Sequence, residues 1–253
     1  MIKEFKKDNL LVKVYENRAA MGEAAADMLI KKINELLDSQ DSINMIFAAA
    51  PSQNEFLAAL RQAPIDWSRV NAFHMDEYVG LSDDAPQRFG NFLKEALFDK
   101  VSFKSVNYLN GNNTDLKGEC QRYSDLLRKY PTDIVCMGIG ENGHLAFNDP
   151  PVADFNDTEL VKPVELDQTC RQQQVNDGCF NSLNVVPTHA LTLTIPTLMA
   201  GKFIYCVVPG KTKAEAVYNT INKDIIEQYP STILRKHPNA ILFIDELSSS
   251  MLN

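Results

Sequence analysis

The chain has 253 residues, of which 45% are hydrophobic and 23% charged, and its formal net charge is -8. This length can bury one sizeable core, so we expect a single domain over residues 1–253, and the acidic balance argues against nucleic-acid binding, which needs clustered cations. Five scattered cysteines without a C-x-x-C pair, and no apolar run near the roughly 18 residues of a membrane span, predict a cytoplasmic protein with reduced thiols and no membrane association.

Helices and strands alternate along the predicted chain. Apolar residues recur at helical spacing over residues 18–39, and Asn17 precedes them as the expected N-cap. The apolar run 43–50 stops at Pro51, and a second helical pattern starts near Asn54, which makes a strand, loop, helix unit. Similar units follow, with strands near 69–75, 106–109, 133–138, 191–195, 202–208 and 240–245, and helices near 87–98, 115–129 and 212–221.

Strands that lack strict alternation and are separated by helices predict a mostly parallel sheet covered on both faces. The expected fold class is therefore α/β, open and doubly wound. Ligands of such sheets lie beyond the carboxyl ends of the strands, so we expect the chemistry in the segments after residues 50, 75, 138 and 208. The segment 150–185 is rich in Asp, Asn and Gln, and we interpret it as an active-site loop or lid.

Two carboxylates, Asp76 and Glu77, follow the strand predicted to end at Met75. A carboxylate at this place can be partly desolvated, which raises its pKa and suits it to take a proton from a carbon next to a carbonyl. The alternative, which we call the structural interpretation, gives neither residue a catalytic role: Asp76 caps the next element and Glu77 is a solvated surface residue. The tripeptide Asp-Glu-Tyr alone favours the structural interpretation.

The loop 138–151 is more specific. Three glycines in six positions let the backbone turn sharply and approach a ligand closely, and His144 shares the loop with Asn142 and Asp149, which can fix its tautomer. The glycines match the G-x-G-x-x-G spacing of a dinucleotide site. We discount that interpretation because the strand lies in the middle of the chain and the last glycine does not open a helix.

A third candidate segment, 209–216, follows the strand predicted over 202–208. Backbone N–H groups at a helix start, with Lys211 and Lys213 nearby, make an anion site suited to phosphate. Tyr205 stands where a nucleotide-binding P-loop needs glycine, so a nucleoside triphosphate site is disfavoured. The structural interpretation is that both lysines are solvated residues at a helix terminus.

The histidines give no metal-binding pattern. They occupy separate segments and form no H-x-x-x-H or H-E-x-x-H face: His74, His144, His189 and His237. We therefore expect no zinc site and no metal or cofactor. His74 with Asp76 and Glu77 offers at most a weak cation site.

Together these segments resemble the glucosamine-6-phosphate deaminase family, which includes galactosamine-6-phosphate isomerases and has 6-phosphogluconolactonases as relatives. The matching pieces are 75–81, 138–150 and 210–217, with weaker likeness in 109–112, in 186–192 and around Arg171. They occur in the family's order and cover most of the chain. The resemblance implies a sugar-phosphate site in one Rossmann-like domain, and it leaves self-association of the chain open.

The resemblance also implies roles for individual residues. Asp76 matches the base that moves a proton from C2 to C1 of the opened sugar, and His144 matches the ring-opening histidine. Asn142 and Asp149 stand in the positions that support this histidine. The residues expected to bind the substrate phosphate are Ser52, Gln53, Arg171 and Lys213. The implied reaction is isomerisation with loss of the C2 amine as ammonia, which leaves a ketose phosphate.

Two departures from the family pattern affect the expected site. The segment 50–54 reads Ala-Pro-Ser-Gln-Asn, where the family usually has Thr-Gly-Ser or Thr-Gly-Gly followed by Thr-Pro, so the loop has less backbone freedom. Asp149 stands where the family commonly has Glu. Because its side chain is one methylene shorter, we expect its contact with His144 to need a shifted loop or a bridging water.

Two other functions stay open at this stage. One is a lactonase acting on a phosphorylated sugar acid. The carboxylate of Asp76 argues against this function, because it suits proton abstraction better than lactone hydrolysis. The other is a catalytically silent sugar-phosphate sensor. Such sensors usually carry a DNA-binding or partner domain, and the sequence shows no helix-turn-helix segment.

Overall fold

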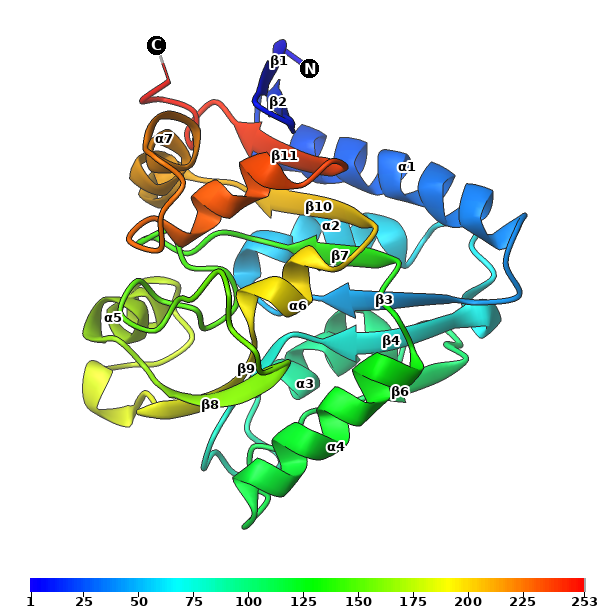
Figure 1. Cartoon of the computed structure of the whole chain (residues 1–253). Coiled ribbons are helices and arrows are strands. Elements are labelled where there is room, and N and C mark those ends of the chain that lie inside the picture. The colour runs from blue at the N-terminus through cyan, green and yellow to red at the C-terminus, as the bar shows by residue number, and fades with distance from the viewer. Residues whose placement is uncertain (253) are drawn as a thin grey trace.

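The computed structural model describes residues 1–252 and contains an eight-stranded sheet with helices on both faces (Figure 1). Its order is β1-β2-β11-β10-β7-β3-β4-β6, and every neighbouring pair is parallel except β1 with β2. Its strands are β1 (Lys3–Lys7), β2 (Leu10–Tyr15), β3 (Ile43–Phe47), β4 (Val70–His74), β6 (Ser105–Asn107), β7 (Ile134–Met137), β10 (Phe203–Val208) and β11 (Ala240–Asp245). The predicted α/β class with a mostly parallel sheet is confirmed.

The helices are α1 (Arg18–Leu37), α2 (Asn54–Leu60), α3 (Phe89–Leu93), α4 (Leu116–Lys129), α5 (Gln168–Asn176), α6 (Ile195–Met199) and α7 (Ala214–Asn222). The side chain of Asn17 accepts a hydrogen bond from the Ala20 N–H at 2.9 Å, which confirms the predicted N-cap of α1. The helix expected near 87–98 is α3 followed by a π-helical turn, Lys94–Phe98. No helix within residues 1–252 has the length and hydropathy needed to cross a membrane.

The sheet separates two apolar clusters, as expected for a doubly wound fold. One cluster packs α1, α2 and α3 against one face, and the other packs α4, α6 and α7 against the opposite face. Strand β3 shows the division, because Met45 and Phe47 belong to the first cluster and Ile46, between them, belongs to the second. Burial on both faces explains why these strands lack polar alternation in the sequence.

A second, three-stranded sheet was not predicted. It consists of β5 (Asp76–Tyr78), β9 (His189–Leu193) and β8 (Val161–Glu165), in the order β5-β9-β8 with antiparallel pairing. The strand expected near 191–195 belongs to this small sheet and ends earlier, since Thr194 caps α6. The strand expected over 69–75 ends at His74, and the chain enters β5 at Asp76. Asp76, the residue predicted to act as the catalytic base, is therefore the first residue of the small sheet.

The segment 150–185 is not a plain loop, contrary to our interpretation. It contains β8 and α5, and β8 was missed because its exposed Pro163 and its short length hide the strand pattern. The hairpin of β1 and β2 was also missed. Its tight turn passes through Asp8, which has a positive φ of 52°, without a glycine to mark it.

Candidate active site

A cleft opens at the carboxyl ends of four parallel strands, the edge that the sequence predicted. The lining after β3 includes Ser52 and Gln53, and the lining after β4 includes Asp76. The loop after β7 contributes Gly140 and His144, and the segment after β10 contributes Lys213. Six of these lining residues come from four separate loops and face one space: Ser52, Gln53, Asp76, Gly140, His144 and Lys213.

Asp76 is a buried carboxylate that still reaches the cleft. Its side chain is 7% exposed, and within residues 1–252 its carboxylate accepts no hydrogen bond. Burial, followed by the charge of Glu77, raises the pKa of the Asp76 carboxyl well above its ordinary value. A carboxylate without competing donors and with a raised pKa is suited to accept a proton from a bound molecule.

Glu77 has a different role, and our interpretation of it as a solvated surface residue is wrong. It is 1% exposed, and its carboxylate accepts hydrogen bonds from the N–H groups of Tyr78 at 2.9 Å, Phe89 at 3.1 Å and Gly90 at 3.0 Å. It therefore joins β5 to the first turn of α3. Asp76 caps nothing, so the structural interpretation of that residue is also wrong. Of the two adjacent carboxylates, Asp76 is the one free to act in the cleft.

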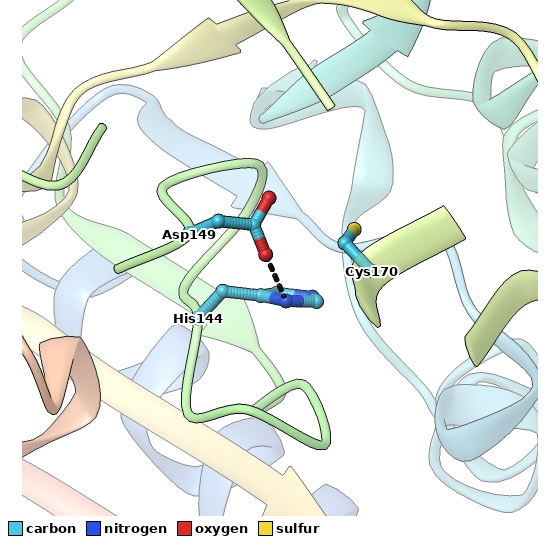
Figure 2. A group of neighbouring side chains, drawn as sticks. All are labelled: His144, Asp149 and Cys170. Atoms are coloured by element: carbon cyan, nitrogen blue, oxygen red, sulfur yellow. Dashed lines mark ion pairs between the residues drawn. The ribbon is translucent and has the colours of Figure 1, made fainter. Parts of the chain in front are cut away.

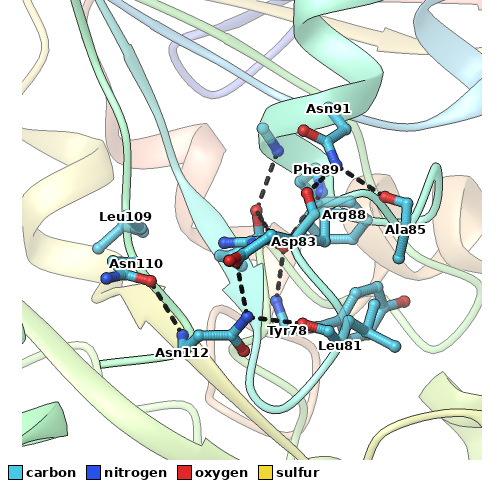
Figure 3. A network of polar contacts seen from close by, with 12 residues as sticks. Tyr78, Leu81, Asp83, Ala85, Arg88, Phe89, Asn91, Leu109, Asn110 and Asn112 are labelled. Carbon is cyan, nitrogen blue, oxygen red and sulfur yellow. Dashed lines mark hydrogen bonds and ion pairs between the residues drawn. The ribbon is translucent and has the colours of Figure 1, made fainter. Parts of the chain in front are cut away.

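The loop between β5 and α3 is fixed by a polar network (Figure 3). Asp83 accepts hydrogen bonds from Arg88 and, at 2.9 Å, from the side chain of Asn112. The side chain of Asn91 donates to the carbonyl oxygens of Asp83 at 2.9 Å and Ala85 at 2.8 Å. This network fixes the loop directly before α3. It therefore also fixes the position of Phe89, the first residue of α3, which lines the cleft.

His74 fixes the backbone of Asp76, a role that the sequence did not reveal. Its Nε2 accepts a hydrogen bond from the Leu109 N–H at 2.9 Å, so its Nδ1 carries the proton and donates to the Asp76 carbonyl oxygen at 2.9 Å. Burial lowers the pKa of His74 to about 4, so the ring is neutral at physiological pH. Both ring nitrogens are engaged, which argues against the weak cation site considered with Asp76 and Glu77.

His144 presents one ring nitrogen to the cleft. Its Nδ1 lies 2.8 Å from Oδ1 of Asn142 and 2.9 Å from Oδ1 of Asp149, the pair drawn in Figure 2. Asn142 in turn donates its amide Nδ2 to Oδ1 of Asp149 at 2.8 Å, which fixes the orientation of the amide. Since both neighbours of Nδ1 are acceptors, Nδ1 carries the proton and Nε2 keeps its lone pair.

The contact between His144 and Asp149 is direct at 2.9 Å, so it needs no bridging water. Asp149 is 1% exposed. Burial on its own raises the pKa of its carboxyl, but the charge of His144 and the hydrogen bonds from His144 and Asn142 outweigh burial and lower it. The structure thus brings the predicted trio of Asn142, His144 and Asp149 together.

Gly140 is required by the position of His144. A Cβ added at Gly140 would lie 2.1 Å from Cε1 and 2.2 Å from Nε2 of the His144 ring, far inside van der Waals contact. The ring therefore lies directly over the backbone at this position. The glycine-rich spacing of the loop serves the histidine and does not open a helix, which supports our rejection of a dinucleotide site.

Cys170 lies beside this pair and was not singled out in the sequence. Its sulfur, a His144 ring nitrogen and an Asp149 carboxylate oxygen lie within 4.8 Å of one another, and this is the one such group of potential metal ligands among residues 1–252. Figure 2 shows Cys170 at the start of α5, across from the carboxylate. Nδ1 and Oδ1 already have protein partners, so the arrangement works without a metal.

Lys213 is the one lysine or arginine among the described residues that line the cleft, so the cleft is cationic where this side chain lies. It is 5% exposed and makes no ion pair within the described residues. Burial lowers the pKa of its ammonium group, and the nearby charges of Asp177 and Glu141 oppose that effect. An ammonium group that is buried, unpaired and open to a cleft is available to an anionic ligand.

Ser52 and Gln53 differ in their availability. The Gln53 amide is 1% exposed and donates to the Val207 carbonyl oxygen and to Oγ of Ser52, both at 3.1 Å. This side chain therefore ties the loop after β3 to β10. Ser52 lines the cleft with a hydroxyl that remains free to donate.

Arg171 does not join these residues. Its Nη2 donates to the carbonyl oxygens of Leu183 and Val186, each at 2.8 Å, and it does not line the cleft. In its place, three residues of the same segment line the cleft, although the sequence did not single them out: Gln173, Gln174 and Asp177. The Asp, Asn and Gln content of the segment 150–185 indicated that this segment belongs to the site, but it could not identify the individual residues that line the cleft.

Comparison with known proteins identifies relatives along nearly the whole chain. Residues 16–243 match the family described as glucosamine-6-phosphate isomerases/6-phosphogluconolactonase. A glucosamine-6-phosphate deaminase of Bacillus cereus (strain B4264) is 34% identical over 242 residues, which is 96% of this chain and 88% of the relative. One of Streptococcus sanguinis is 32% identical over 237 residues, covering 94% and 97%.

Solved structures give a consistent picture. A monomeric glucosamine-6-phosphate deaminase superposes with a TM-score of 0.85 at 28% identity, covering 95% of this chain and 99% of that one. A 6-phosphogluconolactonase from Thermotoga maritima has a TM-score of 0.76 at 18% identity, covering 93% and 99%. The second likeness shows a shared fold and says nothing about activity.

Proposed function

The chain belongs to the glucosamine-6-phosphate isomerase/6-phosphogluconolactonase family, and on that premise we propose that it converts a hexosamine 6-phosphate and water into a ketohexose 6-phosphate and ammonia. The observation that carries this proposal is the buried, hydrogen-bond-free carboxylate of Asp76 in the same cleft as Nε2 of His144. A base and a proton-moving imidazole are the two groups that the reaction needs.

The reaction divides between these two groups. His144, through Nε2, moves a proton from the anomeric hydroxyl to the ring oxygen, so the ring opens to the aldehyde. Asp76 then takes the proton from C2 and returns it to C1, while a second proton passes from the amino nitrogen to O1, so the amino aldehyde becomes an imine at C2 with a hydroxyl at C1. Water adds to that imine and ammonia leaves, so the carbonyl of the product ketose stands at C2.

We expect Lys213 and Ser52, which line the same cleft, to bind the substrate phosphate. The Lys213 ammonium supplies the charge, and the Ser52 hydroxyl supplies a neutral donor. Gln53 supports this loop through its bond to Val207. Arg171 stays a predicted phosphate ligand only if its side chain leaves Leu183 and Val186 when substrate binds.

Lactone hydrolysis is the alternative that the family description retains. It needs a base only to activate water and removes no proton from carbon, so it does not require a second base such as Asp76 beside Nε2 of His144. The close sequence relatives are deaminases, whereas the lactonase above is related at 18% identity. The isomerase and deaminase activity is therefore the better supported one.

The test is to incubate the purified protein with glucosamine 6-phosphate, galactosamine 6-phosphate and 6-phosphogluconolactone separately, and to assay ammonia, ketose phosphate and acid release. We expect ammonia and ketose phosphate in equal amounts from a hexosamine 6-phosphate. Comparison of kcat/KM for the two hexosamines identifies the preferred epimer. Acid release from the lactone without ammonia from either amino sugar would overturn the proposal.

A further inference from the structure

Only one of the two carboxylate oxygens of Asp149 accepts hydrogen bonds from the described residues. Oδ1 accepts from Nδ1 of His144 at 2.9 Å and from the amide of Asn142 at 2.8 Å. Oδ2 is fully buried and receives no hydrogen bond from any described residue. An unpartnered oxygen of a buried carboxylate costs free energy, so a donor for Oδ2 is expected nearby.

The Cys170 thiol is the group placed to be that donor. Its sulfur lies within 4.8 Å of an Asp149 carboxylate oxygen and of a His144 ring nitrogen, and the residue is 1% exposed. Figure 2 shows the three side chains together. Burial, and next the charge of Asp149, raise the pKa of the Cys170 thiol well above its ordinary value. The sulfur therefore keeps its proton at physiological pH and has a hydrogen to donate.

We propose that Cys170 is a positioning residue of the active site, whose S–H donates to Oδ2 of Asp149 and holds this carboxylate against His144. This inference rests on the proposed function, because it assigns Cys170 to the His144 side of that reaction. It also links α5 to the catalytic loop. The first turn of α5 supports Asp149 through Cys170, while its last turns carry Gln173 and Gln174 to the cleft.

The charged and titratable neighbours determine how the donor acts. His144 faces Asp149 from the same loop, and Cys170 faces it from α5. Asp76 on β5 and Asp167 before α5 also act on the thiol, and both keep it protonated. Because all carboxylates near the sulfur favour S–H, the donor is present across the physiological pH range.

A hydrogen bond from the Cys170 thiol would change the pKa of Asp149, which packing of the side chain alone would not do. A hydrogen bond to the carboxylate favours its ionised form, so loss of the bond raises the pKa of Asp149. The ionised carboxylate is needed to orient His144, and it is lost as the pH falls through that pKa. The acid side of the kcat profile in Cys170→Ala should therefore move to higher pH, with KM unchanged.

The experiment compares Cys170→Ala, Cys170→Ser and Cys120→Ala. Serine restores a donor, whereas alanine at 120 removes a buried thiol from α4, away from the cleft. We expect Cys170→Ala to lower kcat on the order of three- to tenfold, the range for one neutral donor. Cys170→Ser should recover most of the loss, and Cys120→Ala should match the wild type in kcat and pH profile.

A measurement without turnover separates this inference from the proposed function. The NMR titration of the Asp149 carboxyl in the free protein should show a higher pKa in Cys170→Ala than in the wild type, because a donor to its ionised form is lost, and Cys170→Ser should restore the lower pKa. Wild-type titration and pH profile in Cys170→Ala would overturn the inference. So would Cys170→Ser behaving as Cys170→Ala although folded, since packing would then explain both. If Cys170→Ala does not fold, Cys170→Val takes its place.

Discussion

The two ends of the cleft are organised differently. At the His144 end, the imidazole is held by Asn142 and Asp149 at 2.8 and 2.9 Å, and the backbone of Asp76 is held by His74. At the Lys213 end, the ammonium group has no ion pair among the described residues, and carboxylates of the chain lie nearby.

This difference separates two tasks. The proton-transfer end is pre-organised, so its geometry is set before any ligand arrives. The cationic end has a single buried ammonium group facing the cleft, and its balance of charge changes when an anion binds. Substitutions at the first end should therefore change kcat, and substitutions at the second end should change affinity.

The largest effect is expected from Asp76→Asn. The amide has nearly the shape of the carboxylate but cannot accept the proton, so we expect kcat to fall on the order of 10²- to 10⁴-fold with KM little changed. Steady-state assays of ketose phosphate check this outcome, and a thermal melt near that of the wild type confirms the fold. Near-normal ketose production by the variant would remove Asp76 from the mechanism.

Gly140→Ala tests the pre-organised end without touching a reacting group. The added methyl group would lie 2.1 Å from the His144 ring, so the ring must move. Displacement of a catalytic group by about 1 Å can cost on the order of 10²-fold in rate, and we expect a fall in kcat of that size. A crystal structure of the variant should show the ring displaced. Wild-type kcat with an unmoved ring would show that the site is not tightly set.

Lys213→Ala tests the cationic end. We expect binding of the phosphorylated substrate to weaken by about 1.5 to 3 kcal/mol, because a charge-assisted hydrogen bond is lost, while kcat changes less. Isothermal titration with the hexosamine 6-phosphate and with the unphosphorylated hexosamine gives both affinities. An equal loss for the two ligands would contradict the phosphate assignment.

The smallest effect is expected from Asp177→Asn, which removes a negative charge that lines the cleft near Lys213. Because this side chain is partly exposed, solvent screens the charge, and we expect phosphorylated substrate to bind only a few-fold more tightly, within about 1 kcal/mol. The gain should shrink as salt is added. Weaker binding of the phosphate ester in Asp177→Asn would mean that this carboxylate helps the substrate to bind.

The sequence located the cleft because its signals are local. Asp76 and the loop that holds His144 each follow a buried apolar strand, so the carboxyl edge of the sheet was enough to bring them together. Asn142 and Asp149 lie in the same loop as His144. Their contact needed no knowledge of distant elements.

Other parts of the site could not be predicted because they depend on tertiary packing. Arg171 and Cys170 are neighbours on α5, a helix with a weak apolar pattern, and only the packing of this helix decides which of them faces the catalytic loop. His74 could not be recognised as a support for Asp76, because its second partner is the backbone of Leu109 on another strand connection. The three-residue strand β5 is too short to leave a periodic signal.

The central claim is that Asp76, shielded in the cleft, carries the C2 proton of a hexosamine 6-phosphate to C1. The most direct measurement is NMR of the product formed from substrate deuterated at C2. We predict ketose 6-phosphate and ammonia in equal amounts, with part of the deuterium at C1, because a base that is 7% exposed exchanges its proton with water incompletely. Absence of ketose, or ketose without any deuterium at C1, would contradict the account.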